Sequence, residues 1–118
     1  MNKRSRQIVL NQTATGVSQD TTQNPQTGAP NVDANGWAHI SQASDRVDIR
    51  IKGTSTAVMT VEVQGLNAVD GSAETLQSYA FTADGEETFF QEPVTYLAYR
   101  TEITAYTTGT LNGFISTV

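Results

Sequence analysis

Polar and apolar residues alternate along two segments in the middle of the chain. RVDIRIKG (46–53) carries an apolar side chain at every second position, between charged ones, and VMTVEVQG (58–65) repeats the pattern. Because successive side chains of a strand point to opposite faces, each segment predicts a strand with one buried and one solvated face. KGTST between them has the glycine and the small hydroxyl residues of a turn. The two segments are therefore predicted to form an antiparallel hairpin.

Strand signals continue to the C-terminus. LQSYAFT (76–82) and ETFFQE (87–92) flank an Asp-Gly turn signal, and TYLAYRTEITAY (95–106) is rich in threonine and tyrosine. Gly109 is predicted to turn the chain into a last strand, which would form a terminal hairpin. No segment has a helical period, and the 18 threonines favour half-solvated strands. The sequence therefore predicts an all-β protein, a single antiparallel β-sandwich or jelly-roll-like domain.

The N-terminal part of the chain lacks this alternation. Between Gln7 and Ser44 the only charged residues are Asp20 and Asp33, and large apolar groups are few. Such a segment cannot bury enough apolar surface to offset the entropy that it loses on ordering. We therefore expect an extended N-terminal arm over residues 1–35, which becomes ordered against a neighbouring subunit, and a β-sandwich domain over residues 36–118.

Composition narrows the possible partners. The net charge of −5 argues against general binding to nucleic acid and against docking on an anionic membrane. Cysteine is absent, which excludes a disulfide scaffold and a thiolate metal site. The apolar run after the basic N-terminus is too short for a signal peptide, and no run approaches the roughly 18 residues of a membrane span. We expect a soluble chain made in a cytoplasm.

Few residues could carry out chemistry. His39 is the only histidine and the carboxylates are scattered, so no metal site is predicted. The DGEE turn brings together Asp84, Glu86 and Glu87, but turn formation explains this pattern better than a calcium loop does. No nucleophile elbow, phosphate-binding loop or zinc-protease motif is present. The sequence predicts a protein that is not an enzyme and needs no cofactor.

Two apolar pairs along the predicted strands cannot face the core together. Phe89 and Phe90 are adjacent, as are Phe114 and Ile115, so one residue of each pair must face outward. Outward aromatic residues of a sandwich bind sugar or pack against another chain. We favour a second chain, because a phenylalanine ring suits a dry contact. The candidate partner-binding residues are Ile8, Val9, Leu10, Trp37, Phe90 and Phe114.

Residues 36–116 also have a layout of strands and turns that resembles the small β-sandwich structural proteins of tailed bacteriophages. The residues that carry the resemblance are Gly53-Thr54, Pro93, Tyr96, Tyr99-Arg100, Ile103, Tyr106 and Gly109-Thr110-Leu111. Similar layouts occur in carbohydrate-binding modules of enzymes and of tail fibres.

The resemblance implies a virion protein made in the host cytoplasm. It would be a subunit that decorates or cements the capsid, or one associated with the tail, and its partners would be major capsid or tail subunits. Such parts commonly form closed homo-oligomers, often trimers. The alternative is a carbohydrate- or receptor-binding β-sandwich module of a tail or fibre protein.

Overall fold

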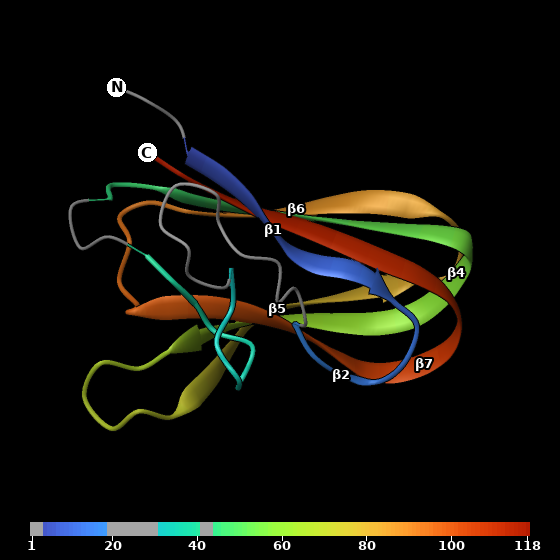
Figure 1. Ribbon diagram of the computed structural model, residues 1–118, viewed down its shortest axis with the longest axis horizontal. Helices are drawn as coiled ribbons and strands as arrows, with labels where there is room; N and C mark the ends of the chain where they lie inside the picture. Colours follow the sequence, from blue (N-terminus) through green and yellow to red (C-terminus); the bar gives the residue numbers. More distant parts are fainter. Residues whose placement is uncertain (1–3, 19–30, 41–43) are drawn as a thin grey trace.

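Seven β-strands make up the regular structure of the computed structural model, which describes residues 4–18, 31–40 and 44–118 (Figure 1). The strands are β1 (Arg4–Gln12), β2 (Gly16–Val17), β3 (Ala38–His39), β4 (Val47–Leu66), β5 (Ala73–Phe81), β6 (Gly85–Gln91) and β7 (Ala98–Thr117). All the strand pairs are antiparallel, which confirms the predicted all-β fold class. No described stretch forms a helix long and apolar enough to cross a membrane.

Two strands of 20 residues each, β4 and β7, form the central ribbon of the fold. Their register breaks between Thr54 and Val58, where residues 55–57 of β4 lie opposite Gly109 alone. Ser55 and Thr56 have φ angles of 60° and 63° there, and the register shift strengthens the bend of the bulged strand. Both strands therefore curve back together, as the green and red ribbons show on the right of Figure 1.

The bent ribbon supplies both layers of the sandwich. The first half of β4 pairs with the last half of β7, and β6 and β1 flank this pair. The second half of β4 pairs with the first half of β7, and β5, β2 and β3 flank it. One hydrophobic core contains residues from both halves of each long strand.

Both predicted hairpins in this ribbon are wrong. The KGTST segment is not a tight turn between two paired strands, because β4 runs through it without a break and its two halves lie in different layers. Gly109 likewise lies inside β7 instead of in a terminal turn. The glycine and hydroxyl residues that indicated turns form a bulge shared by two paired strands. Local turn signals do not distinguish a reversal from a bend, since both need unusual backbone angles.

Small residues allow the two strands to approach closely at the bend. A Cβ atom on Gly109 would lie 2.6 Å from the Cα of Ala57, and one on Gly53 would lie 2.8 Å from the Cβ of Ala57. The backbone N–H of Ala57 donates a hydrogen bond of 2.8 Å to the Asp84 carboxylate, in the turn between β5 and β6. The bend of the ribbon and the connection between its flanking strands are thus tied together.

The alternation that predicted the strands also selects the core. Every second residue of β4 is buried on both sides of the bend, and β7 adds the largest fully buried side chain, Tyr99. The fully or nearly fully buried side chains of the two strands include Val47, Ile49, Ile51, Met59, Val61, Val63, Tyr99, Ile103, Leu111 and Ile115. The prediction of one buried face for each segment is confirmed.

The N-terminal segment is part of this body, which corrects the predicted arm. Strand β1 pairs with the last half of β7, and the side chains of Ile8 and Val9 are 0% exposed. Further along, Ser18 is buried and its backbone N–H donates to the carbonyl of Thr101 (2.8 Å). Ordering this polar segment needs little apolar surface of its own, because the sheet pairs its backbone. Residues 1–3 and 19–30 of the predicted arm lie outside the described residues.

Candidate interaction face

The solvent-facing side of the layer made by β1, β7, β4 and β6 carries two exposed aromatic rings. Phe114 of β7 lies opposite Arg50 of β4, and Phe90 of β6 lies opposite Asp48 of the same strand. The two rings flank β4 roughly 10–12 Å apart, since neighbouring strands lie about 4.8 Å apart. We call this side, with its polar neighbours, the Phe face.

The exposure of the Phe face confirms the expectation drawn from the adjacent apolar pairs. Phe90 is 55% exposed and Phe114 is 36% exposed, whereas their neighbours Phe89 and Ile115 pack on or within the core. Leu10 of β1 is 47% exposed, next to a register shift of that strand. Two of the six predicted contact residues, Phe90 and Phe114, therefore lie on one side of one layer.

Charged residues surround the two rings in opposite pairs. Arg46 lies 3.8 Å from Asp48 and places its guanidinium carbon 5.6 Å from the centre of the Phe90 ring. Arg50 lies 3.4 Å from Glu86 of β6. The alternating pattern of residues 46–52 predicts that Arg46, Asp48 and Arg50 lie on a solvated face. Their position beside the phenylalanines depends on the strand pairing. The paired charges leave the face nearly neutral.

Hydrogen bonds hold the β1 side of the face. The hydroxyls of Ser5 and Ser116 lie 2.7 Å apart, and Gln7 donates from Nε2 to the Asn112 side chain (3.2 Å). Asn112 also accepts from the backbone N–H of Asn11 (3.0 Å). A sheet face held in this way presents its apolar groups without large rearrangement, which favours binding because less conformational entropy is lost.

Ile8, Val9 and Trp37 do not lie on an accessible surface, which corrects their assignment as contact residues. Ile8 and Val9 fill the space between the layers, and Trp37 is only 6% exposed. The Trp37 ring is covered by Arg100, whose guanidinium carbon lies 4.2 Å from the ring centre. Arg100 also donates to the Asn35 carbonyl (2.9 Å) and to Gln64 (2.7 Å). Trp37 therefore anchors the segment before β3.

His39 takes part in the same anchor. Its Nε2 atom lies 3.0 Å from Asp33, whose other carboxylate oxygen accepts from the backbone N–H groups of Asn35 and Trp37, each at 2.9 Å. Burial opposes ionisation, but these hydrogen bonds outweigh it and hold the pKa of Asp33 below its usual range. The hydrogen-bonded pair of His39 and Asp33 thus closes the loop of residues 33–39.

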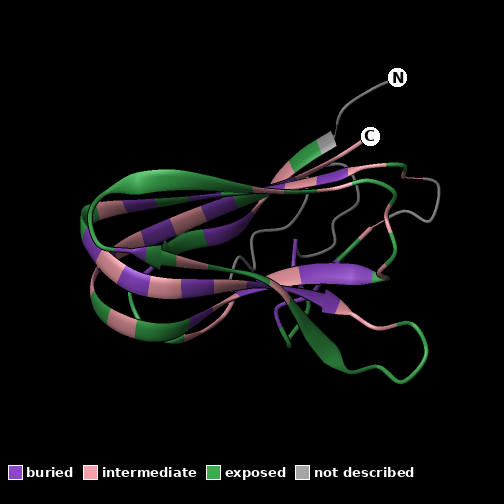
Figure 2. Cartoon of the chain, turned by 180° about the vertical axis from the view of Figure 1, so that it is seen from behind, coloured by how far each residue is buried: buried purple, intermediate pink, exposed green. Residues whose placement is uncertain are grey.

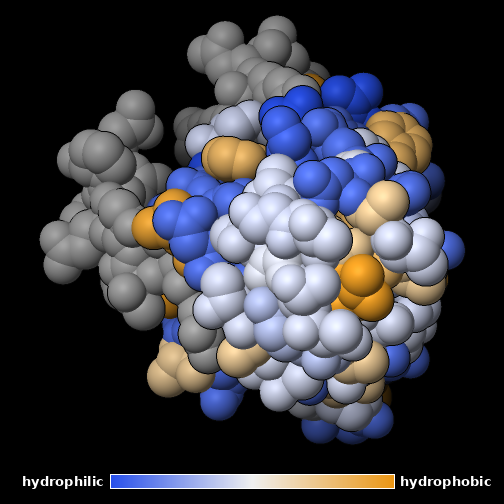
Figure 3. All heavy atoms as spheres, turned by 90° about the vertical axis from the view of Figure 1, so that its right-hand side faces the viewer, coloured by the Kyte–Doolittle hydropathy of each residue, from blue (hydrophilic) through white to orange (hydrophobic). Residues whose placement is uncertain are grey.

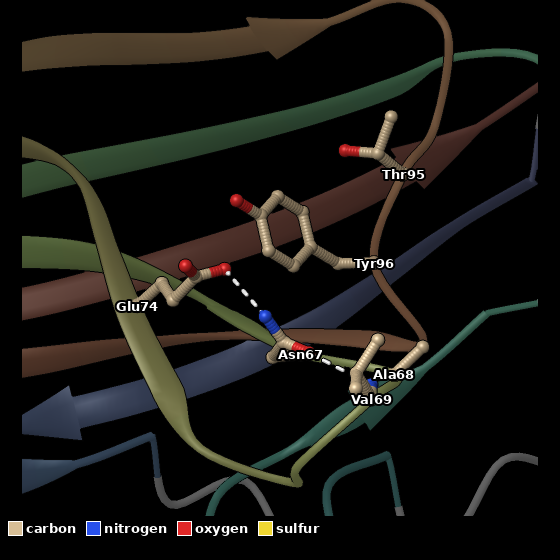
Figure 4. Close-up of a pocket in the computed structure, with 6 residues that line it drawn as sticks. All are labelled: Asn67, Ala68, Val69, Glu74, Thr95 and Tyr96. Atoms are coloured by element: carbon tan, nitrogen blue, oxygen red, sulfur yellow. Dashed lines mark hydrogen bonds between the residues drawn. The ribbon is translucent and has the colours of Figure 1, made fainter.

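A shallow hollow of about 250 Å³ lies between the β4–β5 loop and the segment before β7 (Figure 4). Asn67 donates to Glu74 (3.3 Å), and the Tyr96 ring stands above this pair. Burial and the nearby Glu74 carboxylate raise the pKa of Tyr96. The Tyr96 ring fills the space over Gly65, where a Cβ atom would lie 2.6 Å from it. The hollow thus results from the packing of Tyr96 on Gly65, and Glu74 is the one carboxylate among the residues that line it.

The surface at the bend of the ribbon has little apolar character. Figure 3 looks onto the bend of the ribbon and shows mostly hydrophilic and neutral colours, with scattered hydrophobic spots. The exposed residues of that end include Ser55, Thr56, Thr82 and Thr107. Within the described ranges, no group of three or more His, Cys, Asp or Glu side chains gathers where it could hold a metal ion.

Comparisons with known proteins identify the fold class. No known sequence family and no curated protein matches the chain. The crystal structure of YomS, a protein derived from the SPBc2 prophage, superposes with a TM-score of 0.61 at 10% identity, over 99% of this chain and 94% of that one. The globular domain of zebrafish complement 1qA superposes with a TM-score of 0.52 at 11% identity, over 99% and 97%. The chain thus has the fold of this class of antiparallel β-sandwich.

A family 29 carbohydrate-binding module also superposes, with a TM-score of 0.44 at 11% identity, over 99% of this chain and 86% of that one. This likeness is too low to argue for sugar binding. Among the structures with a higher TM-score, the prophage-derived YomS has a fold similar to that of this chain.

Proposed function

We propose that the protein is a non-enzymatic structural subunit of a bacteriophage particle, one that decorates or cements the capsid. It docks on other virion subunits through the Phe face. The observation that carries the proposal is the pair of exposed phenylalanines on a rigid sheet face with paired charges. Aromatic residues and arginine are enriched where proteins meet, and a few buried rings supply most of the binding energy.

The prophage origin of YomS, whose fold is similar, supports the choice of a phage particle as the setting. The correction of the N-terminal segment changes the proposed mechanism. Residues 4–18 are paired within the body, so the contact relies on the folded surface of the sandwich. The subunit adds stability to the particle by bridging neighbouring subunits with a preformed shape.

The exposed areas of the two rings indicate how much binding they could supply. Phenylalanine buries about 150–250 Å² in a complete contact, so the exposed 55% of Phe90 amounts to roughly 110 Å². At about 25 cal/mol per Å², covering it contributes roughly 2–3 kcal/mol, and the 36% of Phe114 adds roughly 1.5–2 kcal/mol. Removing both rings should weaken binding at least about 100-fold.

The test is loading of purified protein onto particles assembled without this subunit. We expect the wild type to bind to saturation and Phe90→Ser/Phe114→Ser to lose at least about 100-fold in affinity. Val69→Ser is the matched control, because Val69 is 95% exposed in the β4–β5 loop, away from the Phe face, and its removal should leave binding unchanged. Equal loading by the double variant, or no loading by the wild type, would contradict the proposal.

A further inference from the structure

Strand β5 has an unpaired outer edge. It pairs with β4 on one side, and no described strand pairs with its other side. From Ala73 to Ala80 every residue is exposed or half-buried, and Figure 2 shows the β4–β5 hairpin projecting from the body largely in the exposed colour. Its outward N–H and C=O groups are therefore available to another strand.

The other edges of the two layers are better protected than β5, which has one register shift and one charged residue. Strand β1 carries Arg6 and has two register shifts, and β6 begins with Glu86 and Glu87 after its glycine. Strands β2 and β3 have two residues each. Charges, bulges and short length are the usual devices that keep edges from pairing. Within its nine residues β5 has one charge, Glu74, and neither proline nor lysine.

Part of β5 matches a copy of itself. The register with β4 shifts once, near Thr75, and from Gln77 to Phe81 it is unbroken and the strand is free of charge. A two-fold axis at Tyr79 would set Gln77 opposite Phe81 of a second copy, and Ser78 opposite Ala80. No like charges would meet in these pairs, although the chain carries a net charge of −5. Self-pairing of this stretch is therefore compatible with an acidic protein.

We propose that two copies of this chain pair antiparallel through the outer edges of β5, around a two-fold axis at Tyr79. One layer of each sandwich then continues into the other. Tyr79 is half-buried at the margin of the core, and its hydroxyl donates to the Thr88 carbonyl (3.2 Å), so its ring is held in place to meet its twin. Ser78 and Ala80, on the opposite side of the strand, are small and exposed, and they leave room for the second copy.

This inference goes beyond the proposed function and does not depend on it. The Phe face belongs to the other layer, which β6 and not β5 borders. A dimer formed through β5 thus leaves Phe90 and Phe114 accessible. Failure of particle loading and failure of β5 pairing would therefore be separate results.

Disulfide cross-linking tests the pairing and its register. The chain has no cysteine, so Ser78→Cys and Ala80→Cys introduce the only thiols. Directly opposite residues lie within disulfide reach, whereas two copies of residue 78 would be diagonal neighbours at about 7–8 Å. We expect oxidation of a mixture of the two variants to join S78C to A80C at least 10-fold faster than either variant joins to itself. The control is a mixture of T104C and A80C, because Thr104 is exposed but lies on β7.

Sedimentation over a range of protein concentrations supplies a second measurement. We expect the wild type to dimerise reversibly, and Ser78→Lys/Ala80→Lys to lose at least 10-fold in the dimer association constant, because it sets lysines opposite lysines. Glu62 lies opposite Ser78 on β4, so the lysine also gains a partner within the folded monomer. Thr104→Lys/Ala105→Lys adds the same charge elsewhere and should dimerise like the wild type. A wild type that stays monomeric, or cross-linking no faster than with T104C, would overturn the proposal.

Discussion

Substitution of Gly109 by alanine should destabilise the protein more than the same substitution at Gly71, a glycine that also has a positive φ but open surroundings. Gly109 has a φ of 109°, a region that L side chains rarely adopt, and such strain is worth about 1–3 kcal/mol. The added Cβ would also lie 2.6 Å from the Cα of Ala57 and 3.0 Å from the carbonyl oxygen of Thr54. Both neighbours are backbone atoms, so overpacking adds about 1–3 kcal/mol.

The two contributions amount to about 4 kcal/mol, a large share of the 5–15 kcal/mol that is typical of a domain. Equilibrium unfolding in urea, followed by circular dichroism, measures the loss, and a lowering of the midpoint by roughly 2–3 M is expected. Gly71→Ala is the matched control. Gly71 has a φ of 71° but no atom within 4 Å of its Cβ position, so it should lose only about 1–2 kcal/mol.

The comparison isolates the close approach of the two strands at the bend. If Gly109→Ala destabilises the protein no more than Gly71→Ala does, the added Cβ meets no obstruction. The bend at residues 54–58 would then not be the close backbone contact on which the two-layer arrangement depends.

Two further predictions concern the N-terminal half. Val9→Ala should lower the free energy of unfolding by roughly 1–3 kcal/mol, because Val9 is fully buried. Leu10→Ala should lower it by less, because Leu10 is 47% exposed. Equal effects of the two substitutions in urea unfolding would refute the packing of β1. Asp33 has a lowered pKa, so its stabilisation is present above its unfolded pKa of about 3.9 and is lost as the pH falls through the folded value. Asp33→Asn should therefore be less stable than the wild type at pH 7, and the gap should close below about pH 4; a gap that is constant with pH would contradict this.

Much of the core could be predicted from the sequence because alternation depends only on strand geometry. The buried positions of segments 46–53 and 58–65 were assigned correctly on both sides of the bend. The outward direction of Phe90 and Phe114 followed from the same rule, since each is adjacent to a residue that packs on the core. In a strand of regular register, alternation determines which side of the sheet a side chain faces; at the register shift of β1 it fails, since Ile8 and Val9 are both buried.

The arrangement of the strands could not be predicted in this way. Ser55 and Thr56 rarely adopt positive φ angles, and nothing local shows that Gly109 would lie opposite them across the ribbon. Ile8 and Val9 lie in a polar segment, where the sequence predicts that they contact a partner. They are buried instead because β1 pairs with the edge of β7, and that edge is formed by residues distant in the sequence.

Hydrogen exchange of the isolated protein tests most directly the claim that the N-terminal strand belongs to the folded body before any other subunit is met. We predict that amides in residues 6–12 that bond to β7 exchange slowly, with protection comparable to that of residues 111–115, their partners in the sheet. Complete exchange of residues 6–12 within seconds, while residues 111–115 stay protected, would show a free N-terminal segment and contradict the account.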